Sequence, residues 1–180
     1  MLPADEIGRR YAEIKAAAPG VTVVAATKYV SLDDMARLAE AGVEVVGENR
    51  AQDLQAKHDR YARTFRWHFI GHLQSNKVKV VNRTCELVHS LSSASAARRL
   101  EIPALVEVNL SGEASKSGVP PEELEELLGP NVSGLMTMPP FAEDPEASRP
   151  YFRRLRELAE QHGLKELSMG TTQDWRVAVE

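Results

Sequence analysis

The chain has 180 residues, which is enough for one domain with a substantial hydrophobic core. Hydrophobic residues make up 43% and charged residues 27%, as is typical of a globular protein, and the net charge of −4 argues against a surface for nucleic acid or for anionic lipid. The single cysteine, Cys85, excludes an intramolecular disulfide and a cysteine metal cluster. No apolar stretch has the length of a spanning helix, and the amino terminus lacks a signal pattern, so we expect a cytoplasmic protein without a membrane segment.

The pattern of apolar residues predicts strands and helices that alternate along the chain. A helix is expected over residues 4–18, and Pro19 and Gly20 end it. The predicted strands cover residues 21–27, 43–47, 66–70, 86–91, 104–110, 132–138 and 167–169. The helices that follow them are expected near residues 31–42, 50–62, 74–82, 92–100, 121–128, 146–162 and 172–180.

This alternation implies right-handed crossovers and parallel pairing of the strands. Seven such units favour a (β/α)₈ barrel, with a doubly wound open sheet as the alternative. No linker divides the chain, so residues 1–180 are predicted to form a single domain. A closed barrel needs an eighth strand, and the chain stops at Glu180 within the seventh predicted helix. We therefore expect a truncated product, with a strand supplied by a partner or an open barrel as the alternatives.

Lys28 directly follows the apolar, β-branched stretch at residues 21–27. It is thus expected at the carboxyl end of a buried strand, where parallel α/β folds bind ligands. A lysine amine that loses part of its hydration there becomes a free nucleophile that condenses with a carbonyl group. The alternative is a lysine that ends a strand and reaches water.

Six groups of residues fall at the ends of predicted strands. They are Thr27–Tyr29, Gly47–Gln52, Trp67–Lys77, Val108–Leu110 with Ser115–Gly118, Gly134–Met138, and Leu167–Gly170. In this order and spacing they resemble the pyridoxal 5′-phosphate homeostasis protein family, also called the proline synthase co-transcribed homologues. The resemblance runs from about residue 7 to the end, and Trp67–Lys77 is its most specific part.

The resemblance implies a TIM-barrel-like (β/α)₈ fold of the alanine racemase N-terminal-domain type, with strand 8 missing from this chain. It also implies that pyridoxal 5′-phosphate (PLP) is held as a Schiff base on Lys28. Members of the family have no established turnover and are viewed as carriers or buffers in vitamin B6 homeostasis. The resemblance therefore predicts a monomeric PLP-binding protein, not an enzyme, whose further partners are PLP-dependent apo-enzymes.

Three more residues are predicted to contribute to the cofactor site. Asn49 ends the second strand and His72 follows the third, so both are expected at the same rim as Lys28. Asn49 contacts the cofactor or, alternatively, caps the second helix. His72 donates a proton or, alternatively, is a hydrogen-bonded structural imidazole. Met136, in the sixth strand, lines the site or fills the core.

The phosphate group is expected on the loop after the seventh strand, as is usual in barrels. The predicted cofactor-binding residues here are Ser168, in the seventh strand, and Gly170, Thr171 and Thr172 of the loop. Gly170 lets the backbone approach the ligand, and Thr172 donates to phosphate or caps the next helix. The family commonly has Met-Ser where this chain has Thr171-Thr172. Its phosphate-binding arginine follows the eighth strand, beyond the end of this chain, so the resemblance predicts weakened phosphate binding.

Catalysis is the main alternative to cofactor binding alone. Racemisation needs two bases on opposite faces of the substrate, and alanine racemase takes its second base, a tyrosine, from another domain and subunit. Tyr29 adjoins Lys28, but adjacent residues point to opposite faces of a strand if the strand continues through them. Two alternatives stay open, a PLP-dependent racemase-like enzyme and a barrel enzyme that acts on a phosphorylated metabolite. No set of side chains has metal-ligand spacing, so no metal is expected.

Overall fold

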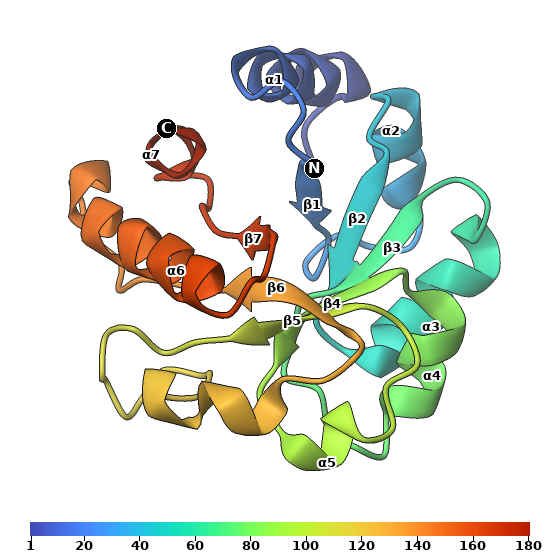
Figure 1. Ribbon diagram of the computed structural model, residues 1–180. Helices are drawn as coiled ribbons and strands as arrows, with labels where there is room; N and C mark the ends of the chain where they lie inside the picture. The colour runs from blue at the N-terminus through green and yellow to red at the C-terminus, as the bar shows by residue number, and fades with distance from the viewer. The chain divides into compact units, whose positions relative to one another are not determined.

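The computed structural model describes residues 1–180, which divide into two compact units. The first unit comprises Met1–Gly71 and Val80–Glu86, and the second comprises His72–Lys79 and Leu87–Glu180. Each unit combines parallel strands with helices (Figure 1). Helix α4 (Val78–Thr84) includes residues of both units.

The first unit contains a parallel sheet of three strands. They are β1 (Val24–Ala26), β2 (Val45–Glu48) and β3 (Arg66–Phe69). The register places Ala26 beside Gly47, and Gly47 beside His68, so these residues form one row across the sheet. All four residues of β2 are buried, as expected for a central parallel strand that is covered on both faces.

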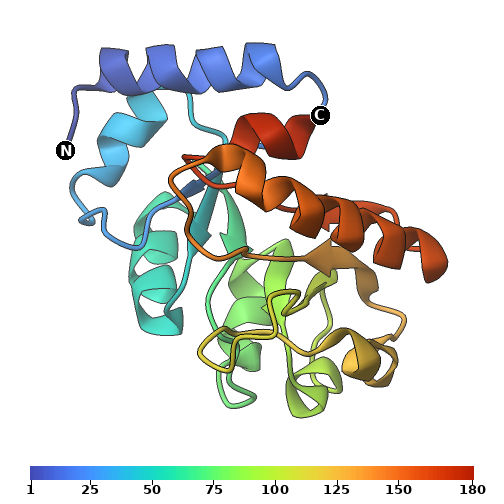
Figure 2. The same cartoon turned by 90° about the vertical axis from the view of Figure 1, so that its left-hand side faces the viewer.

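Three helices accompany this sheet, namely α1 (Ala4–Ala17), α2 (Met35–Glu40) and α3 (Ala51–Tyr61). Helix α1 lies against α2 (Figure 2), and α3 packs on β2. The buried face of α3 consists of Ala51, Leu54 and Lys57, three residues at helical spacing. A lysine on a buried helix face is usually paired with an acid, and here the partner of Lys57 is Glu48 of β2.

The second unit contains four parallel strands that are neighbours in chain order. They are β4 (Leu87–Leu91), β5 (Ala104–Glu107), β6 (Val132–Met136) and β7 (Glu166–Ser168). The helices of this unit are α5 (Ala94–Ala97), η1 (Pro121–Leu127), η2 (Pro145–Ser148), α6 (Arg149–Gln161) and α7 (Trp175–Val179). Helix α6 lies along β6 and β7 (Figure 2) and buries Phe152, Leu155 and Leu158.

The predicted alternation of strands and helices is confirmed, since seven strands occur in the expected order and are parallel within each unit. Two elements differ from the prediction in length or type. Strand β1 is shorter than the predicted 21–27, because its pairing with β2 runs only from Val24 to Ala26. The helix predicted at 121–128 is a 3₁₀ helix. No eighth strand follows β7, and none of the helices combines the length and apolar character that crossing a bilayer requires.

Candidate functional site

Lys28 lies in a tight turn directly after β1. The backbone N–H of Val30 donates to the carbonyl oxygen of Thr27 at 2.8 Å, so Lys28 and Tyr29 are the two central residues of the turn. Thr27 is completely buried, whereas Lys28 is exposed. The structure therefore places Lys28 at the carboxyl end of β1, anchored by a buried residue and presented to solvent.

The amine of Lys28 forms no hydrogen bond or ion pair. Its nearest aromatic neighbour is Tyr29, whose ring centroid is 5.1 Å from Nζ and whose side chain is 91% exposed. The condition under which Tyr29 would point away from Lys28 is not met, because β1 ends at Ala26 and does not continue through these two residues. Other lysines of this unit have acidic partners, for example Lys15, which pairs with Glu44. An amine without an acidic partner remains available to an electrophile.

Asn49 directly follows β2 and is half-buried. It lies two residues beyond Gly47, just past the carboxyl end of β2. The alternative that Asn49 caps the next helix is wrong, because Arg50 holds the N-cap position of α3 and no side chain caps it. Gly71 makes the position of Asn49 possible, since a Cβ atom there would lie 2.1 Å from the Asn49 carbonyl oxygen.

A buried ion pair below the Lys28 turn was not predicted from the sequence. Glu48 Oε1 accepts hydrogen bonds from Thr27 Oγ1 at 2.6 Å and from Lys57 Nζ at 2.5 Å. Lys57 Nζ also donates to the Thr27 carbonyl oxygen at 2.8 Å. Glu48 is completely buried, and its second oxygen, Oε2, has no hydrogen-bond partner. The signal in the sequence was a carboxylate at the end of an apolar strand, with a lysine at a core position of the following helix.

In the second unit, His72 and Met136 differ sharply in exposure. His72 is exposed and its ring forms no hydrogen bond, so the alternative of a hydrogen-bonded structural imidazole is wrong. Met136, the last residue of β6, is only 6% exposed and packs in the core, whereas Met138 beyond it is 57% exposed. Of these residues, His72 is the one with a polar group that is open to a ligand.

Ser168, the last residue of β7, has a partner that the sequence analysis missed. Its hydroxyl oxygen lies 2.7 Å from Nδ1 of His89 in β4. His89 is buried, and the direction of the hydrogen bond depends on its tautomer. A histidine within a mostly apolar strand was the available signal, because a buried imidazole needs a polar neighbour.

The loop after β7 requires the glycine that the sequence predicts there. Gly170 has φ +87°, a region in which side chains are strained, and a Cβ atom would lie 2.8 Å from the Cβ of Ala178. The loop therefore turns at Gly170 and packs closely on α7. Such a bend leaves the following residues, Thr171 and Thr172, exposed.

Asp174 organises this loop. Its Oδ1 accepts hydrogen bonds from the backbone N–H and the hydroxyl of Thr171, at 2.6 and 3.0 Å, and its Oδ2 accepts from Ser148 Oγ at 2.8 Å. Asp174 is 3% exposed and holds the N-cap position of α7, so the alternative that Thr172 caps this helix is wrong. Both donors of Thr171 are thus engaged, whereas the hydroxyl and backbone N–H of Thr172 have no acceptor within the chain.

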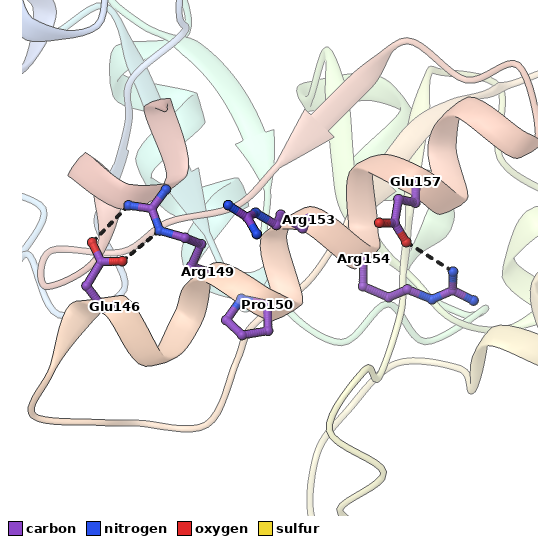
Figure 3. Close-up of a pocket in the computed structure, with 6 residues that line it drawn as sticks. All are labelled: Glu146, Arg149, Pro150, Arg153, Arg154 and Glu157. Carbon is purple, nitrogen blue, oxygen red and sulfur yellow. Dashed lines mark hydrogen bonds and ion pairs between the residues drawn. The ribbon is translucent and has the colours of Figure 1, made fainter.

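A depression of about 440 Å³ lies on the solvent side of α6 (Figure 3). It is lined by Glu146, Arg149, Pro150, Arg153, Arg154 and Glu157. Arg149 pairs with Glu146 and with Glu180, and Arg154 pairs with Glu157. The hydrogen bonds from Arg149 hold the pKa of Glu146 below its usual value. No residue of the predicted cofactor site lines this depression.

Two buried groups are uncharged near neutral pH. Burial lowers the pKa of His68, in β3, to about 4, and the positive charge of Arg66 adds to this effect. Burial also raises the pKa of the Cys85 thiol to about 12, as expected for a thiol packed in the core. No cluster of three or more His, Cys, Asp or Glu side chains is arranged to hold a metal ion.

Comparisons of the sequence identify related proteins over nearly the whole chain. The family described as alanine racemase, N-terminal domain, matches residues 3–175. A pyridoxal phosphate homeostasis protein of Aquifex aeolicus is 40% identical, with 88% of this chain and 79% of that protein covered. A protein of the same name from Deinococcus radiodurans is 36% identical, with 99% of this chain and 92% of that protein covered.

Solved structures that resemble this chain point to the same family as the sequence comparisons. A crystal structure of an unknown protein from Bifidobacterium adolescentis has a TM-score of 0.85 at 29% identity and covers 98% of this chain and 88% of that one. PipY of Synechococcus elongatus, solved with PLP bound, has a TM-score of 0.82 at 28% identity, with 96% and 92% covered. Alanine racemase from Corynebacterium glutamicum, at 16% identity and a TM-score of 0.68, shares the fold. The predicted alanine racemase N-terminal-domain type of fold is confirmed.

Proposed function

Since the chain belongs to the alanine racemase N-terminal domain family and, within it, to the pyridoxal phosphate homeostasis proteins, we propose that it binds PLP and takes part in intracellular PLP homeostasis. The PLP-bound structure of PipY supports this proposal, because the two chains overlap over more than nine-tenths of their lengths. The remaining question is which residues of this chain are suited to the cofactor.

The observation that carries the proposal is Lys28, an exposed lysine at the carboxyl end of β1 whose amine has no acidic partner. PLP supplies an electrophilic aldehyde when it is bound. We propose that the Lys28 amine condenses with this aldehyde to a Schiff base, in which the carbonyl oxygen leaves as water with the two amine hydrogens. Such a linkage is reversible, so it suits a protein that retains a reactive aldehyde and releases it again.

The other proposed contacts fit the same cofactor in chemical type. Asn49, directly after β2 in the first unit, has an amide without a hydrogen-bond partner, and His72 in the second unit has an imidazole without one. Ser168 offers a hydroxyl that is bonded to His89, and we propose that Met136, buried at the end of β6, supplies apolar packing beside the cofactor.

For the phosphate we propose the loop that contains Gly170, Thr171 and Thr172. Thr172 supplies a free hydroxyl and a free backbone N–H, and Gly170 permits close approach of the backbone. Because both donors of Thr171 are directed to Asp174, its proposed role is to shape the loop.

We propose that the protein holds PLP without robust turnover. The relatives are named as homeostasis proteins and not as enzymes. Tyr29, the tyrosine next to Lys28, is 91% exposed, and a side chain surrounded by solvent is poorly fixed as a second base. The resemblance favours a monomeric carrier in the cytoplasm that passes the cofactor to PLP-dependent apo-enzymes.

The test is to add PLP to the purified protein, record the spectrum and treat it with borohydride. We expect a band at about 420 nm, typical of a PLP Schiff base, and a reduced adduct on the peptide that contains Lys28. Lys79→Ala, which removes an exposed lysine of α4, is the matched control and should leave the adduct unchanged. An adduct spread evenly over Lys15, Lys79 and Lys165 would contradict the proposal, and rapid exchange of the α-proton of alanine would favour a racemase-like enzyme.

A further inference from the structure

The ion pair between Glu48 and Lys57 is buried, and a contribution to stability does not readily explain a buried ion pair. Both side chains are almost completely buried, at 0% and 7% exposure. Removing two charges from water opposes folding, and apolar residues of similar volume often serve stability as well or better. Glu48 Oε2 adds to this burden, since it is buried without a partner. A role beyond stability would account for the pair.

The pair bonds directly to the peptide that carries Lys28. The carbonyl oxygen of Thr27, which belongs to the peptide group linking Thr27 to Lys28, accepts two hydrogen bonds at 2.8 Å, one from Val30 N–H and one from Lys57 Nζ. The first closes the turn, and the second joins the turn to α3. Lys57 is itself fixed by Glu48, which also accepts the Thr27 hydroxyl. Every side chain in this chain of contacts is at least nine-tenths buried.

The sheet register explains why these contacts leave the Lys28 side free. Ala26 pairs with Gly47, so the next residues, Thr27 and Glu48, lie side by side on the opposite face, toward α3. The face of Ala26 and Gly47 carries only apolar residues in these two strands, since Val24 and Val45 share it. The polar contacts of Thr27 and Glu48 thus lie on one face of the sheet, and none of them uses the side chain of Lys28 or Asn49, which follow the two strands.

We propose that Lys57 and Glu48 are positioning residues for the Lys28 amine. They hold the Thr27–Lys28 peptide in place, so that the Lys28 side chain extends from a fixed backbone position when its amine condenses with a carbonyl group. This inference rests on the proposed function. It extends that function by assigning a task to two charged residues that do not themselves contact the cofactor. Fixing the backbone of a flexible lysine reduces the entropy lost on forming the Schiff base, because fewer conformations remain to be restricted.

The test separates positioning from stability through a double variant. Lys57→Met leaves Glu48 buried without its cation and is expected to unfold easily, whereas Glu48→Leu combined with Lys57→Met removes both charges and restores an apolar contact. The double variant should therefore remain folded but lack the bond to the Thr27 carbonyl oxygen. Arg66→Met is the matched control, because it breaks an exposed ion pair with Glu86 at the opposite end of β3.

The first measurement needs no cofactor. Backbone order parameters from NMR relaxation should fall at Lys28 and Tyr29 from about 0.85, typical of rigid backbone, to below about 0.6 in the double variant. The amides of α6 serve as an internal reference and should not change. Unchanged order at Lys28 would overturn the proposal, whether or not the protein binds PLP.

The second measurement uses PLP. In the double variant the Schiff-base band should form at least about tenfold more slowly, and its induced circular dichroism should weaken, because a loosely held lysine does not orient the chromophore. Arg66→Met should match the unaltered protein in both. A mobile turn with unaltered rate and dichroism would overturn the positioning role. Absence of any Lys28 adduct in the unaltered protein would instead defeat the proposed function, which the order parameters do not address.

Discussion

The turn at Thr27–Val30 and the loop at Gly170–Asp174 both follow a strand, yet they are anchored in different ways. The turn is held by a buried ion pair in which one carboxylate oxygen has no partner. The loop is held by Asp174, whose two oxygens accept three hydrogen bonds from neutral donors of Thr171 and Ser148. A carboxylate fully satisfied by local donors is a common way to fix a loop. The turn instead uses a buried lysine, Lys57 of α3, and burying its charge beside Glu48 opposes folding. We infer that the position of the turn matters for function.

The largest effect should come from Lys28 itself. Lys28→Ala removes the amine, so the band at about 420 nm and the borohydride adduct should be lost completely. The free energy of unfolding should change by less than about 0.5 kcal/mol, because the side chain is exposed and unpaired. Absorption spectroscopy and urea denaturation check the two parts. A variant that kept the band would show that another lysine carries the cofactor and would end the comparison between turn and loop.

Breaking the ion pair should have the next largest effect, this time on stability. Lys57→Met leaves a buried carboxylate without a cation and should lower the free energy of unfolding by about 3–5 kcal/mol. Adding Glu48→Leu should recover most of that loss. Urea denaturation of the two variants beside the unaltered protein measures both values. If the double variant were no more stable than Lys57→Met alone, the buried, unpaired carboxylate of Glu48 would not be the cause of the loss in that single variant.

Removing the anchor of the Gly170–Asp174 loop should lower the free energy of unfolding by less than breaking the ion pair. Asp174→Ala leaves Thr171 and Ser148 without their acceptor and should cost about 2 kcal/mol, since part of this loop can turn to water for hydrogen bonds. Asp174→Asn keeps one acceptor oxygen and should cost about half as much. If the loop binds phosphate, Asp174→Ala should also weaken PLP binding while leaving the binding of pyridoxal, which lacks phosphate, unchanged. Equal losses for both ligands would argue against phosphate contacts in this loop.

The sequence predicted those parts of the site that depend on strand order. Lys28, Asn49 and Gly170 each follow a strand that the apolar pattern defines, so their places could be inferred without coordinates. The family resemblance added the cofactor. The same reasoning predicted the seven strands and their parallel pairing, because strands that alternate with helices allow few other arrangements.

Contacts between distant residues could not be predicted in this way. Lys57 reaches Thr27 across 30 positions, and His89 reaches Ser168 across 79, so neither contact follows from local periodicity. The capping alternatives for Asn49 and Thr172 failed for a related reason. Arg50 and Asp174 hold the N-cap positions, and a shift of one or two residues in a helix start is beyond what sequence patterns define.

The smallest predicted effect is a loss of stability in acid, and it concerns the sheet that carries the Lys28 turn. His68 lies in the same sheet row as Ala26 and Gly47, whereas the Gly170–Asp174 loop has no histidine. The pKa of His68 is about 4 in the folded protein and about 6.5 in an unfolded chain. As the pH falls from 6.5 toward 4, the unfolded state takes up a proton that the folded state does not, so the free energy of unfolding decreases.

Partial solvation of the imidazole should limit this decrease to about 1–2 kcal/mol between pH 7 and pH 5. The carboxylates with lowered pKa values, Glu6 and Glu146, lose their contribution only below about pH 4.5, so the two effects occupy separate pH ranges. Urea midpoints at pH 7 and pH 5 measure the decrease, and His68→Gln should abolish most of it. An equal decrease in that variant would assign the acid sensitivity to other groups and leave the two anchored segments indistinguishable by pH.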